Sequence, residues 1–326
     1  MIKTEDIFNI KTEDQFNSVA LDVFRFQFEN NLVYRSFCDL LYKHSSDIKE
    51  IKDIPFLPIQ FFKTHKVTSI ENITSKIFES SGTTGSVNSK HYISDLSIYE
   101  TSFLNGFSNF YGNIEDYTIL ALLPSYLERN NSSLVYMVND LIKKSNNPES
   151  GFYLDNLETL KDTLIRLESK GQKTLLIGVS FALLDLIELH QFKLKNTIII
   201  ETGGMKGKRK ELVKSELHDI LKQGFGVSHI HSEYGMTELL SQAYSKGEGV
   251  FNCPPWMKVL IRSTTDPLEI LENKKSGGIN VIDLANVNSC SFIATQDLGK
   301  IHQDNSFEVL GRFDQADIRG CNLMVL

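Results

Sequence analysis

The sequence predicts an α/β protein with a mostly parallel sheet flanked by helices, followed by a small β subdomain. Strand-like apolar runs alternate with amphipathic stretches from about residue 95 to residue 231, and after Trp256 short strands are separated by Gly, Asn and Asp. Alternation of strand and helix with short turns is typical of parallel sheets. We therefore expect an α/β core with a helical N-terminal segment over residues 1–255, and a small β subdomain with a short tail over 256–326.

Each element follows from local spacing. The first 45 residues predict helix, because apolar side chains recur at helical spacing at Phe16, Val19, Ala20, Val23, Phe24 and Phe28. Pro55 and Pro58 exclude a regular helix from the aromatic stretch that follows. Strands are expected over 117–123, 174–177, 197–200, 228–231, 257–261, 278–282 and 291–294. Helices are expected over 95–110, 132–143, 156–170, 181–190 and 208–221.

Composition limits the class of protein. A chain of 326 residues with 41% hydrophobic and 23% charged residues predicts a soluble globular protein with a substantial core. A net charge of −7 argues against a nucleic-acid partner. The longest apolar run, 175–184, is far below the roughly 20 residues of a membrane span, and no signal peptide is apparent. Four scattered cysteines predict neither disulfides nor zinc, so a cytoplasmic location is the simplest interpretation.

A hydroxyl-rich segment follows the apolar pair Ile77 and Phe78. It comprises Ser80, Ser81, Gly82, Thr83, Thr84 and Gly85. The glycines permit positive φ, so that backbone N–H groups can converge on an anion, and the hydroxyls add donors. Lys90 is close enough in sequence to supply a positive charge. The segment does not match the Walker A pattern, and a surface loop or a hairpin tip is the alternative interpretation.

A second polar segment, "HIHSEYGMTELLSQ", covers residues 229–242. Its two histidines are better interpreted as core or edge residues than as metal ligands. Tyr234 and Glu238 come where a strand is expected to end, and ligands of open α/β folds bind at that edge of the sheet. The ring could face a nucleotide base, and the carboxylate could hold Mg²⁺.

These two segments, "SSGTTG" and "YGMTE", together resemble the signature pair of the adenylate-forming superfamily. Further fragments follow in that family's order: "ETGGMKGKR" at 201–209, "TQDLG" at 295–299 and "GRFDQADIRG" at 311–320. The resemblance implies ATP and Mg²⁺ as cofactors, with the metal held by Glu238. It implies nucleotide contacts from the 80–85 segment and from Gly203, Gly204, Tyr234, Gly235, Met236 and Thr237. It also implies that Asp297 and Arg312 fix the ribose.

The end of the sequence departs from typical superfamily members. They continue into a swinging C-terminal domain with a catalytic lysine, whereas this sequence stops at Leu326. With "IPFLPIQFFKTHKV" and "ETGGMKGKRKE", the tail resembles the acyl-protein synthetase branch, whose members carry the acyl group on a cysteine near the C-terminus. The resemblance assigns that role to Cys321, and Lys90 could neutralise departing pyrophosphate. It implies a carboxylic, probably fatty, acid as substrate and an acyl reductase as partner protein.

Several alternatives stay open. The chain could pass an acyl group directly to a small amine, thiol or carrier protein, or it could be a non-catalytic nucleotide-binding subunit. Ser180 lies in a sequence similar to the hydrolase pattern GxSxG, but Ala182 replaces the second glycine, and an N-cap role fits Ser180 as well. The basic cluster at 206–210 fits either a solvated helix start or the edge of the site. The aromatic side chains of Phe56, Phe61 and Phe62 fit either core or an apolar pocket.

Overall fold

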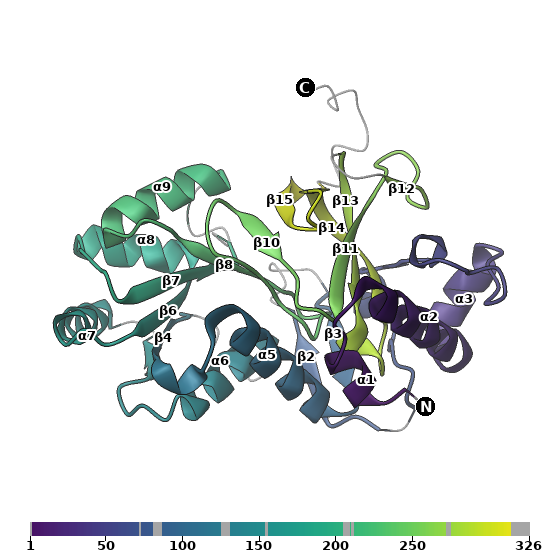
Figure 1. The fold of residues 1–326 in the computed structure, drawn as a ribbon, viewed down its shortest axis with the longest axis horizontal. Coiled ribbons are helices and arrows are strands. Elements are labelled where there is room, and N and C mark those ends of the chain that lie inside the picture. The colour runs from purple at the N-terminus through teal and green to yellow at the C-terminus, as the bar shows by residue number, and fades with distance from the viewer. Residues whose placement is uncertain are drawn as a thin grey trace.

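The computed structural model describes residues 2–71, 73–80, 87–124, 131–153, 156–204, 209, 212–271 and 275–313 (Figure 1). Its α-helices are α1 (Thr4–Phe8), α2 (Glu13–Asn30), α3 (Leu32–Leu40), α4 (Phe61–Thr64), α5 (Leu96–Tyr111), α6 (Ser133–Lys144), α7 (Leu157–Ser169), α8 (Ser180–Leu189) and α9 (Lys214–Phe225). Its strands are β1 (Leu57–Pro58), β2 (Lys76–Glu79), β3 (Lys90–Ile93), β4 (Thr118–Leu122), β5 (Gly151–Tyr153), β6 (Thr174–Val179), β7 (Thr197–Thr202), β8 (His231–Tyr234), β9 (Ala243–Ser245), β10 (Val250–Asn252), β11 (Met257–Arg262), β12 (Ile270–Leu271), β13 (Ser276–Asp283), β14 (Phe292–Ile301) and β15 (Phe307–Arg312).

The main sheet has a parallel half and an antiparallel half. Strands β5, β4, β6, β7 and β8 pair in parallel in that order, with α8 and α9 on one side and α5 and α6 on the other (Figure 1). The order continues through β9, β10, β15, β14, β13, β11 and β12, each pairing antiparallel with the next. The α/β class predicted from the sequence is confirmed. The division of the chain into two units between residues 255 and 256 stays a prediction. Strand β10, before this boundary, pairs with β15, after it, so the hydrogen-bonded sheet crosses the boundary.

Several element boundaries differ from the sequence predictions. The strand expected over 291–294 is β14, which extends to Ile301 along its pairing with β13 and β15. The strand expected over 228–231 runs from His231 to Tyr234, because β8 pairs with β7 only from His231 onward. Tyr234 therefore lies inside a strand and not in the turn after it. The helix expected over 208–221 is α9, which ends at Phe225 because Gly226 adopts a left-handed φ of 67°.

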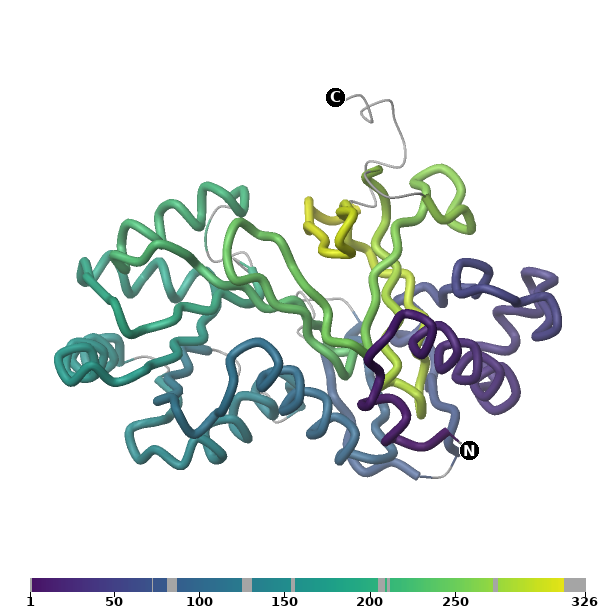
Figure 2. The backbone as a smooth tube through the Cα atoms, viewed as in Figure 1, coloured from purple at the N-terminus to yellow at the C-terminus, as the bar shows by residue number. Residues whose placement is uncertain are grey.

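The N-terminal helices pack against the C-terminal strands, which lie beside them in both backbone views (Figures 1 and 2). Phe24 of α2 contacts the Phe292 ring of β14 edge to face, with ring centroids 6.2 Å apart. Gln27 is fully buried, and its amide donates to the carbonyls of Asn286 and Val287 at 3.0 and 2.9 Å. Residues about 260 positions apart are thereby joined.

Trp256, where the sequence pattern changes, is buried between two layers. Its indole N–H lies 3.1 Å from the Ser102 hydroxyl of α5 and 3.0 Å from the Ser241 hydroxyl. Phe8 of α1 packs against the indole edge to face. The residue therefore ties the N-terminal helix, α5 and the segment after β8 together.

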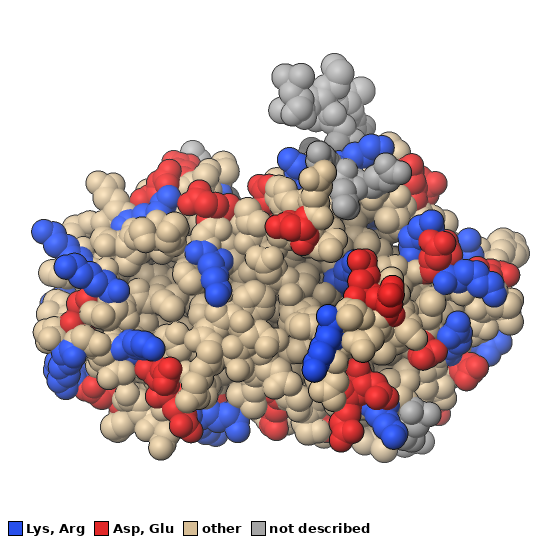
Figure 3. Space-filling view, viewed as in Figure 1, with Lys and Arg blue, Asp and Glu red and all other residues tan. Residues whose placement is uncertain are grey.

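The surface is mixed in charge. On the face drawn in Figure 3, basic and acidic side chains of the described residues are interspersed. None of the described helices combines the length and the apolar character needed to cross a bilayer.

Replacing Gln27 tests how α2 is anchored. Gln27→Leu keeps similar bulk but leaves the Val287 carbonyl without the Gln27 donor, while the Asn286 carbonyl keeps the Ser289 N–H. The change also removes the acceptor of the Ser291 N–H. We expect the free energy of unfolding to fall by about 3 kcal/mol in urea titrations. Glu29→Gln on the exposed side of the same helix is the control and should match wild type. Equal stability of the two variants would contradict this account.

Candidate functional site

The β2–β3 hairpin carries the hydroxyl-rich segment between its strands. Ser80 lies at the base, where its N–H donates to the Ser89 carbonyl at 3.0 Å and its hydroxyl accepts the Ser89 N–H at 2.9 Å. Ser81, Gly82, Thr83, Thr84 and Gly85 lie outside the described residues, as does Cys321.

The hairpin lies against the segment that follows β8. Ser89 hydrogen-bonds through its side chain to the Glu238 carboxylate, and His91 Nδ1 lies 2.9 Å from the Thr237 carbonyl oxygen. Ser89 and His91 are two residues apart on an extended chain and therefore project from one face of it. The hairpin that carries the first polar segment is thus in direct contact with the second polar segment through this face.

His91 has one defined tautomer. A carbonyl oxygen only accepts hydrogen bonds, so Nδ1 carries the hydrogen and Nε2 keeps its lone pair. Burial lowers the pKa of the His91 imidazole to about 4, and Nε2 has no hydrogen-bond partner within the described part of the chain. The edge of the ring contacts Phe62. Phe56 and Phe62 are buried, and Phe61 packs against the core.

Sequence reasoning missed Ser89 and His91. Both follow the hydroxyl-rich segment by a few residues, and alternation along a strand is the signal that could have found them. Lys90, which was chosen instead, projects from the opposite face of β3. Its ammonium lies 3.8 Å from Glu79 Oε1 across the hairpin. The assignment of Lys90 to pyrophosphate stays a prediction.

Glu238 is a buried acidic residue beside the hairpin base. Burial raises the pKa of its carboxyl, and the Ser89 hydrogen bond and the positive charges of Lys63 and Arg312 oppose that rise. Among the described residues no group of three acidic, histidine or cysteine side chains forms a metal cage. A single carboxylate fits Mg²⁺, which proteins commonly bind through one or two carboxylates and substrate phosphates.

Asp297 lies between Tyr234 and Arg312. The Tyr234 hydroxyl donates to Asp297 Oδ2 at 2.9 Å, and Arg312 Nε lies 3.4 Å from Oδ1. Asp297 and Arg312 face each other directly across β14 and β15. The structure therefore brings together three of the residues assigned to the nucleotide.

Glycines occupy two places that other residues would strain. Gly203, directly after β7, has a φ of 67°, in the left-handed region, and Gly204 follows it. A Cβ on Gly235 would lie 2.3 Å from Glu233 Oε1, so any larger residue there requires the Glu233 carboxyl to move. Met236 is half-buried, and its carbonyl accepts the Leu239 N–H.

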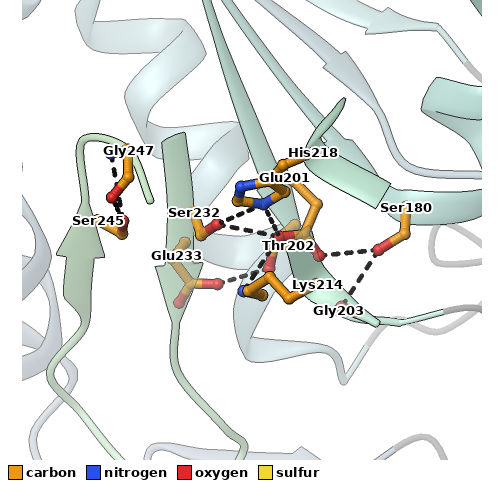
Figure 4. A network of polar contacts seen from close by, with 10 residues as sticks. All are labelled: Ser180, Glu201, Thr202, Gly203, Lys214, His218, Ser232, Glu233, Ser245 and Gly247. Atoms are coloured by element: carbon orange, nitrogen blue, oxygen red, sulfur yellow. Dashed lines mark hydrogen bonds and ion pairs between the residues drawn. The ribbon is translucent and has the colours of Figure 1, made fainter. Parts of the chain in front are cut away.

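Glu201 lies at the centre of a buried polar network at the ends of β7 and β8 (Figure 4). Its carboxylate accepts the Ser180 hydroxyl at 2.8 Å and the Ser232 hydroxyl at 3.1 Å, and Lys214 Nζ lies 3.3 Å away. Burial alone would raise the pKa of Glu201, but His218, Lys214 and Ser180 hold it at about 2. The carboxylate is therefore ionised at neutral pH.

This network corrects the interpretation of Ser180. Ser180 is the first residue of α8, and its side chain makes no cap hydrogen bond, so the N-cap prediction is wrong. Its hydroxyl instead donates to Glu201 and is 1% exposed. Burial also leaves it inaccessible as a hydrolase nucleophile.

Glu233, one residue past Ser232, differs from Glu201. Burial raises the pKa of its carboxyl to about 7, the Thr202 hydrogen bond at 2.5 Å opposes the rise, and the negative charge of Glu201 adds to it. Two carboxyl groups on neighbouring strands thus favour opposite charge states. His218, Lys214 and Ser180 together overcome the effect of burial on Glu201, whereas at Glu233 the charge of Lys214 is the smallest of the effects on the pKa.

The basic cluster is described only at Arg209. Its guanidinium pairs with Asp185 and Glu188 of α8. Lys206, Lys208 and Lys210 lie outside the described residues.

Comparison with known proteins decides the family. A family profile described as "Acyl-protein synthetase, LuxE" matches residues 6–118 and 129–326. The chain belongs to the acyl-protein synthetase family. A relative from Photorhabdus luminescens, long-chain-fatty-acid–luciferin-component ligase, is 41% identical over 68 residues, or 21% of this chain. The match spans 58% of that relative's length.

Solved structures with a similar fold confirm the predicted fold class. ATP-bound MatB from Rhodopseudomonas palustris superposes with a TM-score of 0.56 at 18% identity, covering 73% of this chain and 48% of that one. An open conformation of 2-hydroxyisobutyryl-CoA ligase, in complex with 2-HIB-AMP and CoA, gives 0.67 at 10% identity, covering 93% and 70%. At these identities the likeness concerns the fold alone.

The raised pKa of Glu233 predicts a pH-dependent stability. The folded protein holds the Glu233 proton up to about pH 7, whereas the unfolded chain releases it near pH 4.5, so wild type loses stability as pH rises through that window. Relative to wild type, Glu233→Gln should gain roughly 2 kcal/mol in unfolding free energy between pH 5 and pH 8. Glu216→Gln, exposed on α9, is the control. A constant difference between Glu233→Gln and wild type at both pH values would refute the assignment.

The tautomer of His91 can be read by NMR. In protein with ¹⁵N-labelled histidine, we expect one imidazole with Nδ1 protonated and Nε2 bare, unchanged from pH 8 to pH 5.5, because burial disfavours the cation. His91→Asn assigns this signal by its disappearance. Titration of the assigned imidazole above pH 5.5, or a proton on Nε2, would show that the contact with Thr237 is wrongly described.

Proposed function

We propose that this chain activates a carboxylic acid with ATP as an acyl adenylate and then carries the acyl group as a thioester on Cys321. The observation that supports the first step best is the contact between the hairpin base and the segment after β8, through Ser89 with Glu238 and His91 with Thr237. The hairpin that carries the segment assigned to phosphate thereby contacts the segment that carries Glu238, the residue assigned to the metal.

In the first step a carboxylate oxygen attacks the α-phosphorus of ATP, the bond to the β-phosphate breaks, and pyrophosphate leaves. The 80–85 segment and Thr237 bind phosphate oxygens. Gly203, Gly204, Gly235, Met236 and the Tyr234 ring line the base, and Asp297 and Arg312 hold the ribose. Mg²⁺ held by Glu238 would neutralise phosphate charge.

In the second step a thiolate attacks the acyl carbon, a thioester forms and AMP leaves. The three described cysteines are poor candidates. Cys38 and Cys290 are buried and Cys253 is half-buried. Burial raises the pKa of the Cys38 and Cys253 thiols to about 12, and it raises that of Cys290 as well. Because the thiolate is the nucleophile, Cys321, with Arg319 two residues before it, is the better carrier.

The substrate is a long-chain fatty acid and the acceptor is an acyl reductase. Support comes from the family and from the printed name of the relative, a long-chain-fatty-acid–luciferin-component ligase. The reaction needs no membrane insertion, and we place it in the cytoplasm.

Separating the two half-reactions tests this proposal. Wild type should catalyse fatty-acid-dependent exchange of pyrophosphate into ATP and should become labelled by radioactive fatty acid in the presence of ATP. Cys321→Ser should keep the exchange and lose the label, because only the thioester needs the thiol. Cys253→Ser is the matched control and should keep both.

Three results would contradict the proposal. A label that persists in Cys321→Ser excludes that residue as carrier, and wild type that exchanges pyrophosphate but never becomes labelled transfers its acyl group directly to another acceptor. Tight ATP binding without exchange across a panel of fatty acids would indicate a non-catalytic subunit.

A further inference from the structure

Helix α3, at the outer edge of the molecule beside α2, presents a group of large apolar side chains to solvent (Figure 1). Leu32 is 66% exposed, Leu40 78% and Tyr42, just after the helix, 95%. Among the described residues, no other large apolar side chain is as exposed as Leu40 or Tyr42. Single exposed apolar residues are ordinary on protein surfaces, whereas a group of them on one element indicates an interaction surface.

The helix is apolar on two sides, and the described part of this chain covers only one of them. Tyr34 and Cys38 are four residues apart and fully buried, so they form the side that packs against the core. Leu32, Ser36 and Leu40 are also spaced by four residues and are exposed, so they form a second row on the solvent side. A helix that packs only against its own core carries polar residues on that side.

The turn after α3 holds Tyr42 in a strained conformation. Its φ is 54°, in the left-handed region, which residues other than Gly, Asn and Asp rarely adopt. The Tyr42 N–H donates to the Asp39 carbonyl at 3.0 Å. The ring is almost wholly exposed, so its packing within the described part of the chain does not offset that strain.

The charged residues between these apolar side chains are self-complementary. Arg35 Nε lies 3.7 Å from Asp39 Oδ2, and both side chains are about half exposed. The Arg35 guanidinium also lies over the Phe28 ring, 5.0 Å from its centroid, which restrains its position. The face therefore presents Leu32, a positive charge, a negative charge and Leu40 in that order along the helix.

A second copy of the chain matches this order. A two-fold axis reverses the direction of the helix, so the positive charge of one copy meets the negative charge of the other, and Leu32 meets Leu40. Ser36, at the midpoint, is small enough for the two helix backbones to approach closely. A partner with a different surface would not need this symmetry of charges and apolar side chains about the midpoint.

We propose that the exposed face of α3 is a homodimer interface, in which two copies of α3 pack antiparallel about a two-fold axis near Ser36. Leu40 and Tyr42 of each copy cover Leu32 of the other, and Arg35 of each copy pairs with Asp39 of the other. This inference goes beyond the proposed function and does not depend on it, because none of these residues is assigned to the nucleotide.

Sedimentation velocity over a concentration series tests the proposal. Wild type should shift from the 37.0 kDa chain towards twice that mass as its concentration rises. Leu40→Glu should raise the dissociation constant at least about tenfold, because it places a charge in the apolar contact. Leu268→Glu, at a side chain 52% exposed between β11 and β12, is the matched control and should dimerise as wild type does.

Charge reversal tests the two-fold pairing itself. Arg35→Asp alone and Asp39→Arg alone should each weaken self-association about tenfold, because like charges then face each other across the axis. An equimolar mixture of the two variants should associate more tightly than either variant alone, because opposite charges face each other again. That recovery would also show that both variants are folded.

Three outcomes would overturn the proposal. Wild type that remains monomeric at every concentration excludes self-association through this face. Equal dimerisation of wild type and Leu40→Glu places the interface elsewhere. A mixture of Arg35→Asp and Asp39→Arg that associates no better than either variant alone excludes the two-fold pairing.

Discussion

The contact between β3 and the segment after β8 is the constraint on which the site depends. Ser89 and His91 project from one face of the hairpin and contact Glu238 and Thr237. If the hairpin moved away from that segment, the Glu238 carboxylate and the Thr237 carbonyl would lose these hydrogen-bond donors. A second set of hydrogen bonds also fixes the segment after β8. The buried Asp283 carboxylate accepts the N–H groups of Leu240 and Ser241 at 2.7 and 3.0 Å. Two segments distant in sequence are thus held as one surface.

Charge is distributed around this surface by burial and by local partners. Glu201 is ionised between Lys214 and His218, whereas Glu233 on the next strand keeps its proton to about pH 7. Burial acts on both carboxyl groups in the same direction, so the cations and hydroxyl donors around Glu201 make the difference. The ionised Glu201 of β7 therefore accepts the Ser232 hydroxyl of β8, while the protonated Glu233 adds no second negative charge to the buried region.

Helical periodicity predicted the central helices, and motif order named the candidate site residues, but neither indicates what tertiary pairing decides. The helices α5 to α8 begin and end within two residues of expectation, because their apolar faces repeat locally. The start of β8 depends on pairing with β7, and the hydroxyl of Ser180 depends on Glu201, 21 residues away. Nothing in the spacing of either residue carries that information. For Ser89 and His91 a local signal exists, because alternation along an extended chain places them on one face and Lys90 on the other.

The central claim is that the hairpin and the segment after β8 bind one nucleotide. Hydrogen–deuterium exchange followed by mass spectrometry, with and without Mg²⁺ and a non-hydrolysable ATP analogue, tests it most directly. The account predicts slower exchange in peptides covering 76–93 and 231–240 together, at the same analogue concentration. Slower exchange in only one of these peptides, or in neither while the analogue binds elsewhere, would contradict it.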